Sequence, residues 1–252
     1  MEELCSKVLL SFGQKITKIL KVHKILLTTE LICVHLQPKE NGQKNLKQNR
    51  INKRFVYLIS PNKIKGNEFY IDLEQTLNSK KVSFFQLRLK NETSRNKISI
   101  GKKIKKICKK HRVKFLVNDE PYLAKKLKAD GCHIGQKDMS ILEVKKILKN
   151  KIIGITCHNS INLVKQAIKN HPNYIALGAF YSSKTKKVKF KANIQILKYA
   201  KTMTKIPIVV IGGIKSNNYK KLLLNKANFL AISGYIWNNK KLKPIEAINK
   251  FK

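Results

Sequence analysis

Two acidic residues follow two short apolar runs near the middle of the chain. Asp119 comes after Val113–Val117 and Asp138 after Gly131–Ile134, with the helix-like stretch Pro121–Lys128 between the runs. Neighbouring parallel strands would bring both carboxylates to one rim, where two acids can hold a divalent cation such as Mg²⁺. Each aspartate could instead cap the helix that follows it, and the spacing alone leaves both interpretations open.

An amide and two cations alternate at the end of another apolar run, Val82–Leu87. Gln86, Arg88 and Lys90 stand at every second position, so in an extended chain they would share one face. This set suits an anionic substrate, because arginine offers two parallel donors to a phosphate group. Arg88 is more informative than Lys90, since only five of the 54 basic residues are arginines.

The segment after the apolar run Tyr174–Leu177 places two hydroxyl groups and an ammonium group close together. Ser183, Thr185 and Lys186 could form a clamp for a phosphate or pyrophosphate group. A solvated basic loop is the alternative, and this segment taken alone favours that alternative.

Glycines follow the last two apolar runs of the chain. Gly213 belongs to a Gly-Gly pair after Pro207–Ile211, and Ser233 and Gly234 follow Phe229–Ile232. Glycines at such turns leave backbone N–H groups open to an anion. In barrels of alternating strands and helices, the loops after strands seven and eight often bind phosphate, so these two turns are candidates for a phosphate site.

Apolar runs and amphipathic stretches alternate from Arg54 to the end of the chain. Eight such units predict a compact (β/α)₈ barrel, an α/β fold, over residues 55–252. An open doubly wound sheet is the alternative, but no G-x-G-x-x-G motif follows the first strand. The expected strands are Phe55–Ile59, Val82–Leu87, Val113–Val117, Gly131–Ile134, Ile152–Ile155, Tyr174–Leu177, Pro207–Ile211 and Phe229–Ile232. The expected helices cover Leu73–Leu77, Ser99–His111, Pro121–Lys128, Ile141–Lys149, Ser160–Lys169, Ile194–Thr202, Asn217–Leu224 and Pro244–Phe251.

Residues 1–54 differ in pattern from this repeat. Val8–Leu36 mixes apolar residues and lysines at near-helical spacing, and Lys39–Arg54 is a polar, basic linker. We expect a basic N-terminal extension that is partly helical or loosely ordered. A helix that binds a partner or a membrane surface, and residues upstream of the natural start, are interpretations that stay open.

The charge of the chain is extreme, with a formal net charge of +40. Because the basic residues are almost all lysines, sequence-specific reading of nucleic acid is disfavoured, whereas phosphorylated small molecules would be attracted. The five cysteines are scattered and odd in number, which favours reduced thiols and a cytoplasmic location. Neither a secretory signal nor a membrane-spanning run is expected, and a homo-oligomer is left open.

Taken together, these motifs resemble the thiamine phosphate synthase family. In chain order they read QLRLK, ND, HIGQKD, GITCHN, the SSKTK loop, VIGGI and AISG, and the similarity covers residues 55–237. The resemblance implies a (β/α)₈ barrel that joins hydroxymethylpyrimidine pyrophosphate to hydroxyethylthiazole phosphate. It also implies that Mg²⁺ is required and that thiamine phosphate and pyrophosphate are the products.

The resemblance assigns several residues to the pyrimidine pyrophosphate. Gln86, Arg88 and Lys90 would contact this substrate, with Asn118 beside them, and Thr156 is a further substrate-binding position. Asp119 and Asp138 would hold Mg²⁺ against the pyrophosphate. Arg88, Lys90 and Lys186 would neutralise the charge that develops as pyrophosphate leaves. No general base is required, so we expect His133 and His158 to be structural or loop residues.

The remaining matches concern the thiazole phosphate and the loop after the sixth strand. Gly213 and the backbone amides of Ser233 and Gly234 would receive the thiazole phosphate. Ser183, Thr185 and Lys186 match the substrate-binding T-x-T-K loop of the family. Four positions depart from the usual family residue. Thr156 replaces a serine and Ser183 a threonine, so a hydroxyl group is kept at both. Gly234 replaces a serine, and Glu120 replaces an arginine, which adds negative charge beside the metal site and could strengthen cation binding or disturb the pyrophosphate.

Two rival functions remain. A thiazole tautomerase on the same barrel would not need the full set of cations and acids proposed for the pyrophosphate, so their joint presence favours the synthase. A noncatalytic polyanion-binding protein would fit the net charge, but the chain has no arginine-rich or aromatic-interleaved patch to support it.

Overall fold

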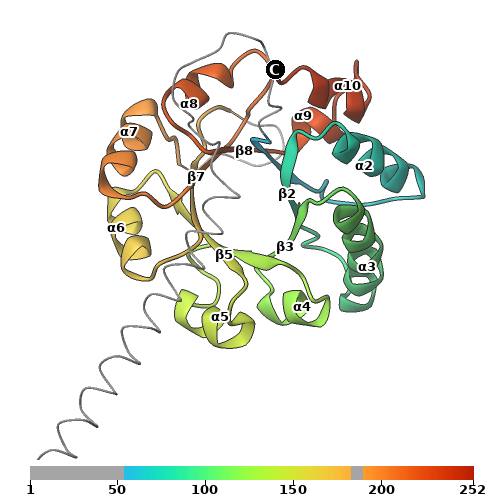
Figure 1. Ribbon diagram of the computed structural model, residues 1–252, viewed down its shortest axis with the longest axis horizontal. Helices are drawn as coiled ribbons and strands as arrows, with labels where there is room; N and C mark the ends of the chain where they lie inside the picture. Colours follow the sequence, from blue (N-terminus) through green and yellow to red (C-terminus); the bar gives the residue numbers. More distant parts are fainter. Residues whose placement is uncertain (1–53, 183–189) are drawn as a thin grey trace, which may run out of the picture. The chain divides into compact units, whose positions relative to one another are not determined.

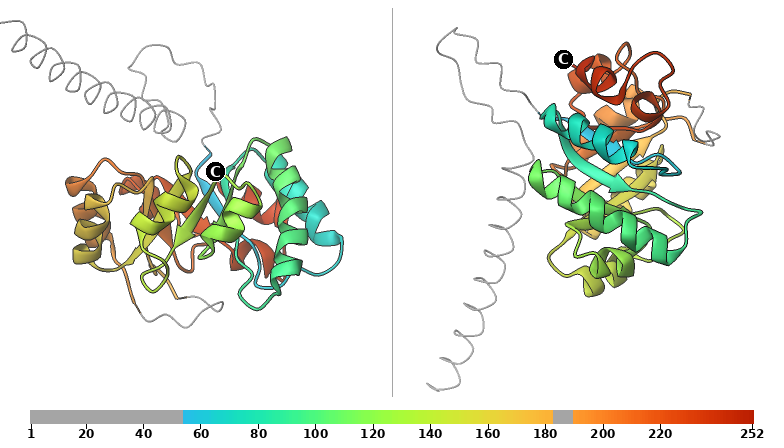
Figure 2. Two further views of the ribbon diagram at one scale, coloured as in Figure 1. Left: turned by 90° about the horizontal axis from the view of Figure 1, so that it is seen from below. Right: turned by 90° about the vertical axis from the view of Figure 1, so that its right-hand side faces the viewer.

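The structure is a computed structural model that describes residues 54–182 and 190–252. In this part of the chain the predicted barrel is confirmed: eight parallel strands close into a ring in the order β1 to β8, and helices surround the ring (Figure 1). Figure 2 shows from two further sides that the helices lie outside the strands. The strands are β1 (Val56–Ile59), β2 (Val82–Leu87), β3 (Lys114–Asn118), β4 (Gly131–Ile134), β5 (Ile152–His158), β6 (Tyr174–Gly178), β7 (Ile208–Ile211) and β8 (Phe229–Ile232).

Each expected helix is present, with changed ends. The helices are α2 (Glu68–Asn78), α3 (Ser94–Lys110), α4 (Pro121–Lys126), α5 (Ile141–Leu148), α6 (Ile161–Lys169), α7 (Ile194–Met203), α8 (Lys220–Leu224), α9 (Gly234–Trp237) and α10 (Pro244–Asn249). Two differences matter for the rim of the barrel. Strand β5 continues to His158, past the expected end at Ile155. The short helix α9 was not expected, because four residues that begin with glycine are too few to show a helical period.

Side-chain caps set where several helices begin. Thr93 accepts a hydrogen bond from the N–H of Asn96 at 3.2 Å before α3, and Ser160 caps α6 in the same way. Ser140 and Glu143 form a capping box before α5. Each such cap stabilises its helix by about 1 kcal/mol. Because each of these helices follows a strand, the caps also fix the loops at the carboxyl ends of the strands.

Polar residues just before β4, β6 and β8 fix how neighbouring strands align. In each case a side-chain oxygen of this residue accepts a hydrogen bond from a backbone N–H of the strand that comes just before it in the chain, which is β3, β5 or β7. A strand that slipped by one residue would lose this bond and turn its side chains to the wrong face. The acceptor and donor pairs are Asp130 with Phe115, Asn173 with Ile153 and Asn228 with Ile208, at 2.8 Å in each pair.

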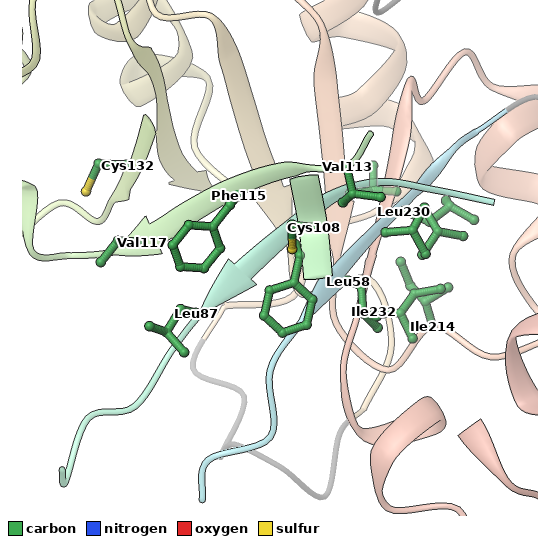
Figure 3. Close-up of a cluster of buried hydrophobic side chains, with 14 of the residues drawn as sticks. Leu58, Leu87, Cys108, Val113, Phe115, Val117, Cys132, Ile214, Leu230 and Ile232 are labelled. Carbon is green, nitrogen blue, oxygen red and sulfur yellow. The ribbon is translucent and has the colours of Figure 1, made fainter. Parts of the chain in front are cut away.

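The main hydrophobic core lies between the strands and the surrounding helices (Figure 3). Leu58, Phe115, Cys132 and Ile232 come from four different strands and are at most 2% exposed. Alternate residues of a strand point to opposite faces, so these side chains point outward from the barrel and their neighbours point inward. Burying one such side chain contributes about 1.5–3 kcal/mol.

Aromatic rings fill the interior of the barrel. Tyr57, Phe84 and Tyr174 pack together with ring centroids 5.4, 5.7 and 6.1 Å apart, and Phe229 meets Phe84 edge to face. Gly154 on β5 leaves room for this cluster, because a Cβ atom there would lie 1.9 Å from the ring of Tyr174. The interior is therefore a packed core that also contains two tyrosine hydroxyl groups.

The predicted N-terminal extension, residues 1–54, lies outside the described residues except for Arg54. Cys5 and Cys33 lie outside them as well. In the part of the chain that the structure describes, the remaining three cysteines are buried and form no disulfide. No helix in that part is long and apolar enough to cross a membrane.

Candidate active site

Asp119 stands in the turn that follows β3. Its φ angle is +61°, a left-handed conformation that aspartate and asparagine adopt more readily than most residues. Its backbone N–H donates to the carbonyl oxygen of His133 on β4 at 2.7 Å. The turn is therefore tied to the neighbouring strand, which fixes where the Asp119 side chain leaves the backbone.

Asp138 reaches the same place from the turn after β4. Its carboxylate accepts a hydrogen bond from the N–H of Gly135 at 2.7 Å. Burial raises the pKa of this carboxyl group, and the Asp119 carboxylate within hydrogen-bonding reach raises the pKa further, against the opposing effects of the Gly135 bond and Lys90. Two carboxyl groups held this close favour a cation or a proton between them, so the pair fits the expected Mg²⁺ site.

Neither aspartate caps a helix. The residue before α4 is Glu120, whose side chain makes no capping hydrogen bond, and α5 is capped by Ser140. The interpretation of Asp119 and Asp138 as helix caps is therefore wrong. Among the described residues no group of three or more His, Cys, Asp or Glu side chains could hold a metal ion. A cation bound by this pair would need further oxygen ligands from substrate or water, as is usual for Mg²⁺.

Two lysines pair with acids on this rim. The Nζ atom of Lys90 lies 3.3 Å from Asp119, and the Lys90 side chain is 57% exposed. The Nζ atom of Lys97, on α3, lies 2.7 Å from Glu120, and its side chain is only 12% exposed. Lys97 thus offsets the negative charge of Glu120. Sequence reasoning missed Lys97, because in a chain so rich in lysine a single lysine carries no signal.

Gln86, Arg88 and Lys90 do not share one face. Strand β2 ends before Arg88, so the alternation of side chains that predicted a common face stops there. Gln86 is 2% exposed and points into the barrel, where its Nε2 atom donates to a tyrosine hydroxyl at 3.0 Å. Arg88 donates to Asn62 in the loop after β1 at 3.0 Å, whereas Lys90 turns toward the loop after β3. The three residues lie on neighbouring parts of the rim but contact three different elements.

Ser60, directly after β1, joins three strand ends and was not singled out from the sequence. It is 2% exposed. Its hydroxyl accepts from the N–H of Arg88 at 2.9 Å, and its carbonyl oxygen accepts from the hydroxyl of Ser233 at 3.1 Å. The sequence did contain a signal for Ser60, because it is a polar residue directly after an apolar run. The same kind of signal identified the acids after β3 and β4.

Hydrogen-bonded side chains cross the interior of the barrel. The hydroxyl oxygens of Tyr57 and Tyr174 lie 2.8 Å apart, and that of Tyr174 lies 2.9 Å from Nδ1 of His133. The Nε2 atom of His133 lies 2.8 Å from Oγ1 of Thr156. Burial lowers the pKa of His133 to about 4, with the charge of Asp138 acting in the opposite direction. A half-buried, neutral imidazole supports the expectation that His133 is structural.

The loop that carries the predicted clamp follows β6. Its described ends are tied together, because the N–H of Ala179 donates to the carbonyl oxygen of Phe190 at 3.0 Å and the N–H of Ala192 donates to that of Ala179 at 2.8 Å. The ring of Phe190 also packs on His158, with centroids 4.5 Å apart. The clamp residues Ser183, Thr185 and Lys186 lie outside the described residues, so the clamp stays a prediction.

The two turns proposed for a phosphate group differ in what they leave open. Gly213 has a φ angle of +59°, and a Cβ atom there would lie 2.2 Å from the carbonyl oxygen of Ser182. Close packing of the backbone therefore explains why this position is a glycine. That its N–H donates to an anion stays a prediction. Ser233 and Gly234 stand at the start of α9, where the first N–H groups of a helix have no partner within the helix.

A hollow of about 560 Å³ lies beside the two aspartates. Asp119 and Asp138 line it together with Ser94 at the start of α3 and Tyr122 at the start of α4. A second hollow, of about 680 Å³, is lined by α7 and the ends of the adjoining loops, and it contains no described residue of the predicted site. Most other lining residues of the first hollow belong to α3 and α4, and apart from the two aspartates it contains no predicted site residue.

Comparison with known proteins places the chain. A family model of thiamine monophosphate synthase matches residues 56–236, which cover most of the barrel. The chain belongs to the thiamine monophosphate synthase family. The thiamine-phosphate synthase of Pelagibacter ubique is 70% identical over 207 residues, which are 82% of this chain and 100% of that relative. The thiamine-phosphate synthase of Erythrobacter litoralis is 36% identical over 197 residues, which are 76% of this chain and 92% of that relative.

Solved structures agree with the fold. A thiamine phosphate pyrophosphorylase from Pyrococcus furiosus superposes with a TM-score of 0.69 at 24% identity, over 79% of this chain and 94% of that chain. A 3-hexulose-6-phosphate synthase superposes with a TM-score of 0.55 at 15% identity, over 78% of this chain and 98% of that one. At such identities the likeness shows a shared barrel and nothing about the reaction.

Membership of the thiamine monophosphate synthase family confirms the resemblance drawn from the motifs. It makes the protein a transferase of thiamine biosynthesis. The relatives named thiamine-phosphate synthase support the synthase over the rival interpretations, a tautomerase and a noncatalytic polyanion-binding protein. The individual site residues and the metal ion stay predictions.

Proposed function

We propose that the protein joins hydroxymethylpyrimidine pyrophosphate to hydroxyethylthiazole phosphate and releases thiamine phosphate and pyrophosphate. The observation that carries the proposal is the meeting of Asp119 and Asp138 at adjacent strand ends, with Arg88 and Lys90 on the next strand end. Two carboxylates that can bind a metal ion, beside the positively charged side chains of Arg88 and Lys90, suit the binding of a pyrophosphate group better than they suit a proton transfer. The family match and the two synthases that resemble this chain support the choice of substrates.

The pyrophosphate would lie across the rim between β2 and β4. Asp119 and Asp138 would hold Mg²⁺ there, and the bound ion would supply positive charge against the pyrophosphate oxygens. Arg88, already oriented by Asn62, offers a planar fork to the same group. Lys90 is mostly exposed, and such ion pairs are weak, so it can leave Asp119 for the pyrophosphate when the substrate binds.

These charges would make pyrophosphate a good leaving group. As the carbon–oxygen bond breaks, the electron pair stays with the departing oxygen, where Arg88, Lys90 and Lys186 stabilise it. The pyrimidine-methyl cation that remains is stabilised by the amine of its own ring. The thiazole nitrogen then donates its electron pair and forms the new carbon–nitrogen bond. No protein base takes a proton in this sequence, which agrees with a half-buried, neutral His133.

The thiazole phosphate would be held on the opposite part of the rim. The backbone N–H groups of Gly213, Ser233 and Gly234 would donate to it, since they follow β7 and β8. Ser183 and Thr185 would add hydroxyl groups from the loop after β6. We also expect the enzyme to act in the cytoplasm, because its scattered cysteines favour a reducing compartment.

A coupling assay with both phosphorylated precursors and Mg²⁺ tests the proposal directly. Thiamine phosphate should form only when both precursors are present, should disappear when a chelator removes Mg²⁺, and should return when Mg²⁺ is added back. Folded protein that makes no thiamine phosphate under these conditions would contradict the proposal. A salt titration of RNA binding serves as the second arm, because nonspecific binding by lysines should fall steeply with salt concentration.

A further inference from the structure

Five polar side chains form one continuous line of hydrogen bonds inside the barrel. They come from five different strands, and successive heavy atoms lie 3.0, 2.8, 2.9 and 2.8 Å apart. All four distances are those of well-formed hydrogen bonds. In order, the line runs through Gln86, Tyr57, Tyr174, His133 and Thr156. We call it the interior chain.

Counting protons gives the interior chain a direction. The Nε2 group of Gln86 can only donate, so the hydroxyl oxygen of Tyr57 accepts and the single Tyr57 proton goes to Tyr174. The single Tyr174 proton then goes to Nδ1 of His133, which must accept it. The proton of the imidazole therefore sits on Nε2 and is donated to Thr156. His133 is thereby held neutral, in one tautomer.

The opposite direction requires a different arrangement of the amide. If the Gln86 oxygen faced Tyr57, each hydroxyl proton would reverse and the imidazole proton would move to Nδ1. With the Gln86 nitrogen facing Tyr57, a doubly protonated imidazole would leave one tyrosine hydroxyl proton without an acceptor among residues 54–182 and 190–252, which is costly for a buried group. The orientation of the Gln86 amide and the tautomer of His133 are thus linked across the barrel, so a measurement of one determines the other.

The two ends of the interior chain are left with unused hydrogen-bonding capacity. Within the described residues, nothing donates to the amide oxygen of Gln86, and nothing accepts the hydroxyl proton of Thr156. We propose that the interior chain positions these two groups, so that Gln86 presents an acceptor and Thr156 a donor to one planar nitrogen heterocycle that carries an amino group. Tyr57, Tyr174 and His133 are positioning residues that act through Gln86 and Thr156.

This inference rests on the proposed function, whose pyrimidine substrate carries such an amino group, and on the resemblance that makes Gln86 and Thr156 substrate-binding residues. It adds the reason why the site rejects a ring with a different pattern of hydrogen-bond donors and acceptors. An analogue that lacks the amino group, or that carries an acceptor in its place, would leave the Gln86 oxygen unpaired in a buried site. The interior chain prevents the amide from turning over to suit such an analogue, because a turned amide would require every proton in the line to reverse.

Nitrogen-15 NMR of histidine-labelled, full-length, ligand-free protein at neutral pH tests the direction without any activity assay. The chain has six histidines, so the His133 signals are identified by their absence in His133→Gln. We expect Nε2 to be protonated and Nδ1 to be unprotonated. A proton on Nδ1, a charged imidazole, or rapid exchange between the tautomers would overturn the inference.

Tyr174→Phe cuts the interior chain while keeping the ring. We expect His133 to lose its single tautomer, and KM for the pyrimidine pyrophosphate to rise about tenfold with a smaller change in kcat, as the loss of one or two neutral hydrogen bonds implies. The matched control is Tyr219→Phe, another buried tyrosine, whose hydroxyl bonds the backbone of Lys252 at 2.6 and 2.9 Å away from the interior chain. Equal effects of the two variants on tautomer and KM would show that the interior chain positions nothing.

Thr156 supplies the second test. Thr156→Val keeps the shape but removes the acceptor for Nε2 of His133, whereas Thr156→Ser keeps the hydroxyl. KM for the pyrimidine pyrophosphate should rise clearly more in the valine variant, and the reverse order would refute the role of the hydroxyl.

Failure of the proposed function can be told apart from failure of this inference. An Nε2–H tautomer in protein that makes no thiamine phosphate would support the interior chain and reject the function, and coupling activity with the Nδ1–H tautomer would reject the interior chain alone.

Discussion

The metal-binding role proposed for Asp119 depends on its backbone as well as on its carboxylate. The left-handed turn at φ +61° and the bond from its N–H to His133 aim the side chain toward Asp138. The ion pair with Lys90 joins an exposed side chain and contributes little to stability. A substitution that keeps the backbone and removes the charge therefore isolates the role of the carboxylate, and asparagine is suitable because it tolerates the left-handed conformation.

Asp119→Asn and Asp138→Asn should each lower turnover by at least about 10²-fold, the scale expected when one strong electrostatic stabiliser is lost. Each should also raise the Mg²⁺ concentration needed for half-maximal rate. Steady-state rates measured over a Mg²⁺ titration give both quantities. Asp72→Asn, which removes a carboxylate on α2 outside the predicted site, is the control. Turnover and Mg²⁺ response near those of the control in both variants would rule out the metal assignment.

At the scale of elements, the loops after β6 and β7 pack closely on each other. The N–H groups of Phe180 and Tyr181 donate to the carbonyl oxygens of Ile211 and Gly212, both at 3.0 Å. Gly213 lies in the same contact, with no room for a side chain. The first loop leads to the predicted clamp and the second to a predicted phosphate donor, so the pairing of these loops would set the distance between the two groups.

Gly213→Ala should therefore destabilise the protein more than a positive φ angle alone explains. Gly66 provides the matched control, because its φ of +63° is similar and a Cβ atom there meets nothing within 4 Å. We expect Gly66→Ala to cost about 1 kcal/mol from the strained backbone. Gly213→Ala should cost about 2–4 kcal/mol, because the clash with Ser182 adds to that strain. Thermal or urea unfolding measures both costs, and equal costs would mean that the contact is loose.

The interface between strands and helices also determines the reactivity of three thiols. Burial raises the pKa of Cys132 and of Cys157 to about 12, and burial raises that of Cys108 as well. Since the thiolate is the reactive form, all three should resist alkylation in folded protein and react quickly after unfolding. Peptide mapping by mass spectrometry measures each site. Lys109→Cys, one residue away on α3 but exposed, is the reactive control, and modification of the buried thiols at the rate of this control would contradict their burial.

At the scale of the whole molecule, the barrel and the preceding segment have separate roles to test. Every predicted site residue lies beyond Arg54, and the family match begins at residue 56. Strand β1 pairs with both β2 and β8, so the ring is closed from Val56 onward. We therefore propose that residues 1–54 contribute no chemistry, whatever else they bind.

A truncated protein that begins at Asn52 should fold and keep its coupling activity. A second truncation that begins at Pro61 lacks β1 and should not fold, because β2 and β8 then lose their shared partner. Circular dichroism and the coupling assay distinguish the two results. If the first protein is folded but inactive, the extension belongs to the active site and the proposed division of the chain is incorrect.

The sequence by itself determined the barrel and most of its rim. Strand and helix periods are local, so short apolar runs such as Gly131–Ile134 and Phe229–Ile232 were predicted with the bounds that the structure has. The placement of Asp119 and Asp138 on one rim followed as well, because a polar residue that ends an apolar strand in a parallel barrel must stand at its carboxyl end. The chemistry of the family was carried by motifs of the same local kind.

Only the tertiary structure decided which side chains meet. Lys97 pairs with Glu120, Arg88 bonds to Asn62, and Ser60 bonds to Arg88. In each pair the two residues are more than 20 positions apart in the chain. The interior chain shows the reason most clearly. Tyr57 and Tyr174 are 117 positions apart and look like ordinary apolar strand residues. A hydrogen bond depends on distance and direction between atoms, and closure of the ring brings those two hydroxyl groups together.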